Sequence, residues 1–145
     1  MKTIILSAAF LLLGAIGAKS QTGMMAELTF QKEVHDYGNV KQGGNGDCEF
    51  KFTNTGSAPL IISNAVGSCN CTVPKWPKDP IMPGESGVIK VHYGTDRVGP
   101  INKTVTITAN VEGNTKVVRI KGNVLAGETA GAPVKTENML KSDQP

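Results

Sequence analysis

The sequence predicts an all-β fold, an immunoglobulin-like β-sandwich of about seven strands in a single domain. Three observations support this prediction. Apolar residues recur at every second position in several short segments, which is the period of a strand with one buried face. The chain has 17 glycines and 8 prolines, and many of them separate these segments as turn residues do. No long segment has the 3.6-residue period of an amphipathic helix, so short strands joined by turns are expected.

The N-terminus has the layout of a secretory signal peptide, which we assign to residues 1–20. Lys2 supplies a positive charge, residues 4–16 are almost continuously apolar, and small residues precede the expected cleavage site near Ser20. The apolar stretch is shorter than the roughly 20 residues of a membrane-spanning helix, which favours cleavage over a retained anchor. We therefore expect a periplasmic or secreted protein with no membrane span after cleavage.

The charge balance of the mature chain argues against nucleic acid as a partner. Removing Lys2 and Lys19 leaves 13 basic residues against 12 acidic ones, a net charge of 13 − 12 = +1. The remaining length has room for one core, and we expect a monomer. We assign a loose lead-in to residues 21–26, the sandwich to residues 27–125, and a disordered tail with few apolar residues to residues 126–145.

The first half of the domain is expected to contain three strands. The range 27–34 has Leu28, Phe30 and Val34 on one face, and a bend through Gly38 and a glycine-rich turn follow it. Residues 48–54 alternate clearly between apolar and polar side chains. After turn chemistry at residues 54–57, the apolar run 60–66 forms the third strand, which residues 68–73 continue beyond a break at Gly67.

The second half begins with four prolines in residues 74–83, and Trp76 lies among them. Because proline cannot donate to a sheet ladder, this segment is expected to be an ordered loop or an edge, with Trp76 covering one end of the core. Three alternating segments follow it and are expected to be strands, at residues 89–93, 101–109 and 116–124.

Several motifs in this order resemble a bacterial family known as domain of unknown function 1573. They are His-Asp-Tyr-Gly at 35–38, Phe-Lys-Phe-Thr-Asn-Thr-Gly at 50–56, Pro-Leu at 59–60, Ser-Cys-Asn-Cys-Thr at 68–72, Ile-Met-Pro-Gly-Glu at 81–85 and Ile-Lys-Gly-Asn-Val at 120–124. The resemblance covers residues 28–124. It implies a sandwich related to Hydin-type and PapD-like domains, of a kind found in small exported proteins of Bacteroidetes. This chain has Asn70 where the family usually has glycine, and Cys48 is an addition.

The three cysteines, Cys48, Cys69 and Cys71, are the most reactive residue types in the chain. In an extended strand the Cα atoms of Cys69 and Cys71 would lie about 6.5 Å apart, near the upper limit for a disulfide. A bridge from Cys48 to either one is geometrically freer if the strands are neighbours, and export favours its formation. All three single-bridge pairings stay open, and a structural bridge or simple buried cysteines are the ordinary interpretation.

Two further hypotheses concern the Cys-x-Cys pair. With His92 as a third ligand, Cys69 and Cys71 would hold copper or zinc, since thiolates and imidazole are ligands that these ions prefer. A redox role would require a thiol with a lowered pKa. Otherwise no cofactor is expected.

Catalysis has weaker support in the sequence. His35 next to Asp36 resembles a general base with its orienting carboxylate, but no nucleophile motif accompanies it, and Asp36 fits a turn in which it accepts backbone N–H groups. We therefore expect a non-enzymatic module of the cell envelope that is structural or binds a protein or glycan. Its binding surface would be an exposed sheet edge or the proline-rich loop with Trp76.

Overall fold

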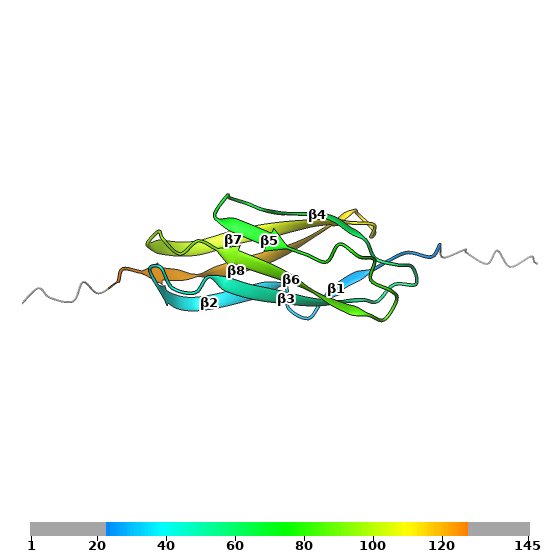
Figure 1. The fold of residues 1–145 in the computed structure, drawn as a ribbon, viewed down its shortest axis with the longest axis horizontal. Helices are drawn as coiled ribbons and strands as arrows, with labels where there is room; N and C mark the ends of the chain where they lie inside the picture. The colour runs from blue at the N-terminus through cyan, green and yellow to red at the C-terminus, as the bar shows by residue number, and fades with distance from the viewer. Residues whose placement is uncertain (1–22, 128–145) are drawn as a thin grey trace, which may run out of the picture.

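The computed structural model describes residues 23–127, which form two four-stranded sheets packed face to face (Figure 1). The first sheet has the order β1-β3-β6-β5 and the second the order β2-β8-β7-β4. The strands are β1 (Leu28–Phe30), β2 (Val34–Lys41), β3 (Asp47–Asn54), β4 (Ile62–Gly67), β5 (Thr72–Lys75), β6 (Ser86–Tyr93), β7 (Gly99–Ala109) and β8 (Thr115–Leu125). The predicted all-β sandwich is confirmed, with eight strands rather than about seven.

The described chain enters at one end of the long axis of the sandwich and leaves at the other (Figure 1). The predicted signal peptide and nearly all of the predicted tail lie outside the described residues. Within residues 23–127 no helix is long and apolar enough to cross a membrane.

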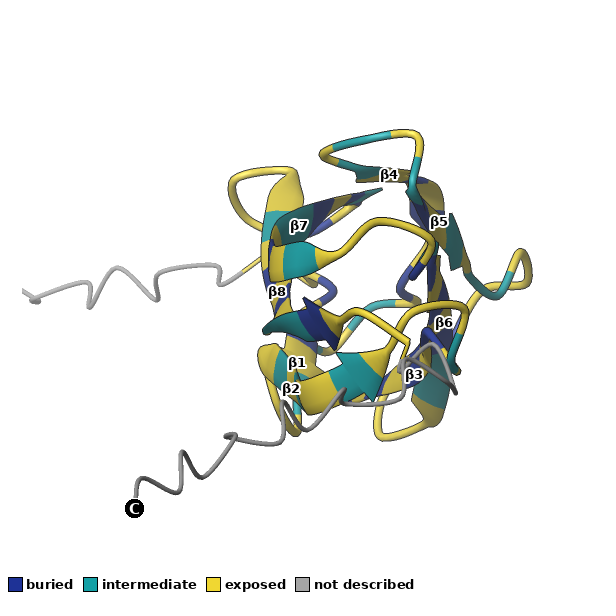
Figure 2. Ribbon diagram, turned by 90° about the vertical axis from the view of Figure 1, so that its left-hand side faces the viewer, coloured by how far each residue is buried: buried dark blue, intermediate teal, exposed yellow. Residues whose placement is uncertain are grey.

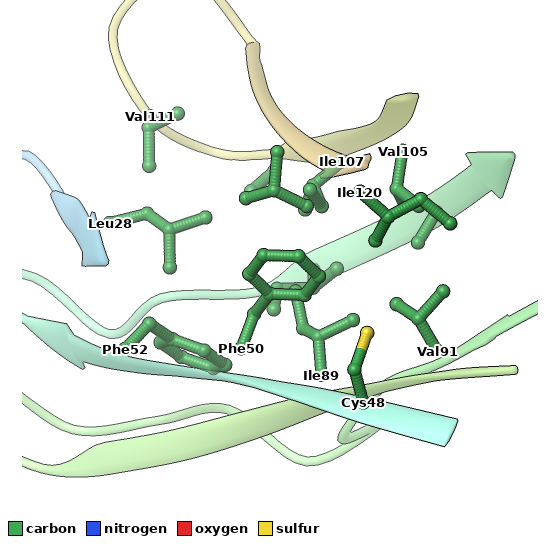
Figure 3. Packing of buried hydrophobic residues seen from close by; sticks show 14 of the residues in the cluster. Leu28, Cys48, Phe50, Phe52, Ile89, Val91, Val105, Ile107, Val111 and Ile120 are labelled. Atoms are coloured by element: carbon green, nitrogen blue, oxygen red, sulfur yellow. The ribbon is translucent and has the colours of Figure 1, made fainter. Parts of the chain in front are cut away.

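The core consists of the inward-facing halves of the alternating strands. On β3, Cys48, Phe50 and Phe52 are buried whereas Glu49 and Lys51 are exposed, as the alternation predicts (Figure 2). The facing layer of β7 and β8 supplies branched aliphatic side chains that are fully buried: Val105, Ile107, Val118 and Ile120. Figure 3 shows three of them, Val105, Ile107 and Ile120, in the core. Burying a side chain of this size contributes roughly 1.5–3 kcal/mol. Packing between the two sheets is therefore the main source of stability.

The N-terminal segment differs from the single strand expected at residues 27–34. It forms β1 in the first sheet, crosses over at residues 31–33, and continues as β2 in the second sheet, parallel to β8. The segment expected to bend is therefore a strand. Gly38, with φ of 60°, lies where the register shifts between Asp36 and Asn39, so the bend is a bulge within β2.

A buried asparagine ties three loops together where β3 ends. Asn54 has no exposed surface, and its Oδ1 accepts the backbone N–H groups of Glu27 (3.2 Å) and Gly56 (3.0 Å). Its Nδ2 donates to the carbonyls of Ala58 (2.8 Å) and Ile81 (2.9 Å). All its hydrogen-bonding groups therefore have partners in the interior.

Candidate functional site at the crossing from β4 to β5

The chain crosses from the second sheet to the first between β4 and β5, and both are edge strands. They lie next to each other on one side of the sandwich (Figure 2). Gly67 makes this approach possible, because a Cβ atom there would collide with the carbonyl oxygen of Thr72. We call the surface formed by β4, the turn 68–71 and β5 the crossing face.

The turn of the crossing face contains a disulfide between Cys69 and Cys71, with a Cα–Cα distance of 5.2 Å. The expectation that residues 68–73 continue a strand was wrong at this point, because the chain turns and Thr72 N–H donates to the carbonyl of Cys69 (3.1 Å). Turning shortens the Cα–Cα distance relative to an extended strand and brings it within the range of ordinary disulfides. Of the three pairings left open by the sequence, the structure therefore has Cys69 with Cys71.

The bridge does little to hold the sandwich together. Its two cysteines are two positions apart, so the bridge closes a loop of three residues. If a disulfide stabilises the fold by lowering the entropy of the unfolded chain, closing a three-residue loop contributes about 1.6 kcal/mol, compared with about 3 kcal/mol for a 15-residue loop. Backbone hydrogen bonds already fix the turn on both flanks, from Ser68 N–H to the Thr104 carbonyl and from Gly94 N–H to the Cys71 carbonyl, each 2.8 Å. The conformation of the turn therefore does not depend on the disulfide.

The sulfur of Cys69 lies 3.3 Å from the hydroxyl oxygen of Thr72, which is 3% exposed. A disulfide sulfur carries no hydrogen, so the Thr72 hydroxyl is the donor. Sulfur is a weak acceptor, and a buried hydroxyl usually has a stronger partner. The Thr72 hydroxyl is therefore positioned to stabilise a negative charge on the sulfur of Cys69.

Two hollows flank the disulfide. One, of about 510 Å³, is lined by Cys69, Cys71, His92, Asp96 and Arg97, among others. The other, of about 330 Å³, lies between the ends of the edge strands and is lined by uncharged residues: Val66, Gly67, Cys69, Thr72, Val73 and Pro74. Cys69 and Cys71 are half-buried, and Asn70 between them is exposed. The bridge is thus accessible from both sides.

The crossing face carries no charge except at its last residue, Lys75, and this feature was not noticed in the sequence. No Asp, Glu, Lys, Arg or His occurs between Lys51 and Lys75, a range that includes β4, the turn and all of β5 before Lys75. By contrast, the outward face of β3 and β6 carries the pairs Asp47–His92 and Glu49–Lys90. The absence of charge can be read directly from the sequence, but only the fold shows that these residues share one surface.

Trp76, predicted to cover one end of the core and to be a binding residue, packs partly buried against the core. Its indole N–H donates to the carbonyl of Ile62 (3.1 Å), and the ammonium nitrogen of Lys78 lies 3.4 Å from its ring centroid. Trp76 therefore fastens β4 to the loop after β5. One ring face is already covered by a cation.

His92 lies on the exposed face of β6, where its Nδ1 is 2.7 Å from a carboxylate oxygen of Asp47. It lines the same hollow as Cys71, but among residues 23–127 no three His, Cys, Asp or Glu side chains are grouped as a metal site would require. The copper or zinc hypothesis needs Cys69 and Cys71 as thiolates, and here they are bridged. That hypothesis stays a prediction about the reduced protein.

Cys48 is the free cysteine and lies 5% exposed in the core. Burial raises the pKa of its thiol, and this effect is larger than the lowering of the pKa by the nearby Tyr37 hydroxyl. Tyr37 itself donates to the carbonyl of Gly46 (2.6 Å), and burial likewise raises its pKa. Cys48 is thus a small core residue with little thiolate character.

The pair of His35 and Asp36 is not arranged as a catalytic dyad. The Asp36 carboxylate accepts the N–H of Gly38 (2.8 Å), as the turn interpretation predicts, and pairs with Lys121 (3.2 Å). His35 packs against the ring of Tyr37, with centroids 4.6 Å apart. The carboxylate therefore stabilises the bulge of β2.

The arrangement of the two sheets defines an immunoglobulin-like β-sandwich module. The family model described as protein of unknown function (DUF1573) matches residues 28–124, and the chain belongs to this family. The resemblance deduced from the motifs is thereby confirmed.

Solved structures with the same fold include a protein of unknown function from Porphyromonas gingivalis W83, with a TM-score of 0.58 and 16% identity over 69% of this chain and 46% of that one. The PapD-like domain 7 of human CEP192 has a TM-score of 0.58 and 7% identity, covering 86% of this chain and 100% of that one. Part of the secreted serine protease VesC from Vibrio cholerae has a TM-score of 0.53 and 15% identity, over 68% of this chain and 23% of that one.

The chain thus spans less than half of the Porphyromonas protein and less than a quarter of the protease. At these identities the likeness establishes the fold alone. No match was found among curated proteins.

Proposed function

We propose that this protein is a non-enzymatic binding module that acts in the cell envelope or outside the cell, and that it binds an extended segment of a partner protein along the edge of β4. The observation that carries this proposal is that β4 is an edge strand of the crossing face with no charged residue and no proline. An extended segment that adds to such an edge gains main-chain hydrogen bonds, and its side chains occupy neighbouring hollows.

The four edge strands differ in how well they would accept an added strand. β1 has only three residues, β5 contains Pro74, and β2 is interrupted by the bulge at Gly38. These are the ordinary devices that prevent pairing at an edge. β4 has neither proline nor charge, and beyond an irregularity after Ile62 its residues pair regularly with β7 through Gly67. β4 is therefore the edge best suited to strand addition.

The surroundings of β4 favour an apolar or uncharged partner segment. Val66 and Val73 are about half exposed, at 54% and 49%, and both line the hollow between the strand ends. A charged segment placed there would lose hydration without gaining an ion pair. A glycan is the less suitable partner, because the indole N–H of Trp76 is already engaged and Lys78 lies over its ring.

The non-enzymatic part of the proposal is supported by the geometry around His35, whose neighbouring carboxylate is directed to Gly38 and Lys121.

Site-specific photocrosslinking in the cells that express the protein tests this proposal. The crosslinking amino acid is placed at Val66 on β4, at Val34 on β2 and at Val117 on β8, whose exposures of 54%, 45% and 52% are closely matched. In the antiparallel register with β7, the Ala65 N–H faces the free edge of β4. We expect a discrete protein adduct from position 66, and its loss when Ala65→Pro removes that donor and blocks pairing at the same edge. Equal adducts from positions 34 or 117, or an adduct that survives Ala65→Pro in a folded protein, would contradict the proposal.

A further inference from the structure

We infer that the Cys69–Cys71 disulfide is a thiol–disulfide exchange site that accepts electrons from a dithiol of a partner protein. This chemical activity goes beyond the binding role proposed above. It rests on three features of the turn: an accessible bridge, a backbone that does not depend on it, and a hydrogen-bond donor aimed at one of its sulfurs.

This bridge differs from a structural disulfide in two ways: solvent can reach it, and the fold does not depend on it. Structural disulfides usually join distant segments and are buried between them, whereas this one closes a loop within a single turn. Its residues are half-buried between two hollows, and Asn70 projects into solvent. The turn is fixed by backbone hydrogen bonds of Ser68, Thr72 and Gly94, which involve no sulfur. Opening the bridge therefore leaves the backbone of the turn in place.

The Thr72 hydroxyl makes the two sulfurs chemically unequal. It lies 3.3 Å from Cys69 Sγ and already donates to it in the bridged form. When the bridge opens, the same donor stabilises the thiolate of Cys69, since hydrogen bonds to charged acceptors are stronger than those to neutral ones. In exchange, the thiol with the lower pKa leaves faster. Cys69 is therefore the leaving group, and Cys71 is the sulfur that is attacked.

The hollow on the Cys71 side supplies an approach for the attacking thiolate. Arg97 lines it together with Asp96 and His92, so it contains a permanent cation, unlike the hollow between the strand ends. A negatively charged nucleophile is attracted by the Arg97 guanidinium.

The reaction proceeds in two balanced steps. A thiolate of the partner attacks Cys71 Sγ, a mixed disulfide forms, the Cys69–Cys71 bond breaks, and Cys69 departs as a thiolate that accepts the Thr72 hydrogen bond. The second thiolate of the partner then attacks the partner's sulfur in the mixed disulfide. A disulfide forms within the partner, and Cys71 leaves as a thiolate. Two electrons pass from the partner dithiol to the bridge. The two protons of that dithiol are taken up by Cys69 and Cys71 or by solvent, according to pH.

The experiment uses the mature folded protein, with dithiothreitol as the dithiol and alkylation plus fragment mass analysis as the readout. We expect native Cys69 and Cys71 to become labelled in buffer without denaturant, while Cys48 stays unlabelled and the circular dichroism of the sheets is unchanged. We expect Thr72→Val to open about tenfold more slowly, because one hydrogen bond to a charged sulfur is lost. Thr95→Val removes a similarly buried hydroxyl, bonded to the Gly44 carbonyl, and serves as the matched control with a native rate.

Three results would overturn the inference: a bridge that opens only when urea unfolds the protein, loss of the sheets on reduction, or equal opening rates in Thr72→Val and native protein. If Thr72→Val does not fold, the pH dependence of iodoacetamide labelling in the reduced native protein decides. A lower apparent pKa for Cys69 than for Cys71 supports the inference, and identical profiles contradict it. Because dithiothreitol needs no protein surface, these results are independent of partner binding at β4.

Discussion

The indole N–H of Trp76 donates a hydrogen bond of 3.1 Å to the backbone carbonyl of Ile62, and this contact joins the two sheets at the start of β4, away from the turn 68–71. Trp76 follows β5 of the first sheet, and Ile62 begins β4 of the second. The proline-rich loop is therefore an ordered element, whose tryptophan positions the start of the edge strand that we propose as the binding surface.

Replacing Trp76 with Phe should lower the free energy of unfolding by about 1–2 kcal/mol, because the Ile62 carbonyl loses its donor and some packing is lost. Urea unfolding followed by circular dichroism measures the change. Lys78→Ala, which removes only the cation over the ring, should cost no more than about 1 kcal/mol. Equal effects of the two substitutions would show that the hydrogen bond to β4 is unimportant.

Asn54→Leu should be among the most damaging substitutions, with a loss of about 3–5 kcal/mol, because four backbone groups lose their buried partner at once. Asn110→Leu is the matched control. Asn110 also bonds two backbone groups, the Ile61 N–H and the Pro59 carbonyl, but it is exposed and water replaces it. We expect a loss below about 1 kcal/mol there. Similar losses at both positions, measured by urea unfolding, would argue against the buried network.

Alkylation of the unfolded, unreduced protein should label one cysteine, and the labelled fragment should contain Cys48. After reduction, all three cysteines should be labelled. Intact mass gives the number of labels, and fragment mass gives their positions. A label at Cys69 or Cys71 before reduction would mean that Cys48 has a partner and that the turn is built differently.

The Asp36 carboxylate should make stability depend on pH in the acid range. Its pKa lies below its ordinary value, chiefly because it accepts the Gly38 N–H and also because Lys121 is nearby. A group whose pKa is lower in the folded protein stabilises the fold above its unfolded pKa, and this contribution is lost as pH falls through the folded pKa. We expect Asp36→Asn to have a lower Tm than the native protein at pH 6, and we expect the difference in Tm to shrink as the pH falls through the acid range. A difference in Tm that does not change with pH would contradict this assignment.

Much of the fold was predictable because alternation records which side chains face the core. On β3, the alternation of Cys48, Phe50 and Phe52 with polar residues predicts the buried face directly. The sequence pattern did not predict β2, and the reason is physical. It is an edge strand whose inward positions, His35 and Tyr37, are only half-buried, and Gly38 breaks its register, so its pattern resembles a turn.

The candidate site was less predictable, because it depends on contacts between segments. The sequence places Cys69 and Cys71 two positions apart, but whether they bridge depends on a turn stabilised by Thr72 and Gly94. The donor to Cys69 is an ordinary threonine with no motif of its own. That β4 and β5 form one surface, uncharged up to Lys75, follows only from the crossing between the sheets.

Amide hydrogen exchange would show whether a partner binds at the edge of β4. It would be measured on the protein alone and with the partner identified by crosslinking from position 66. We expect exchange to slow by at least about tenfold within residues 64–67 and to stay unchanged in β2, because an added strand protects the free amides of the edge that it pairs with. Protection confined to β2, or unchanged exchange in β4 when the partner is saturating, would contradict the proposal.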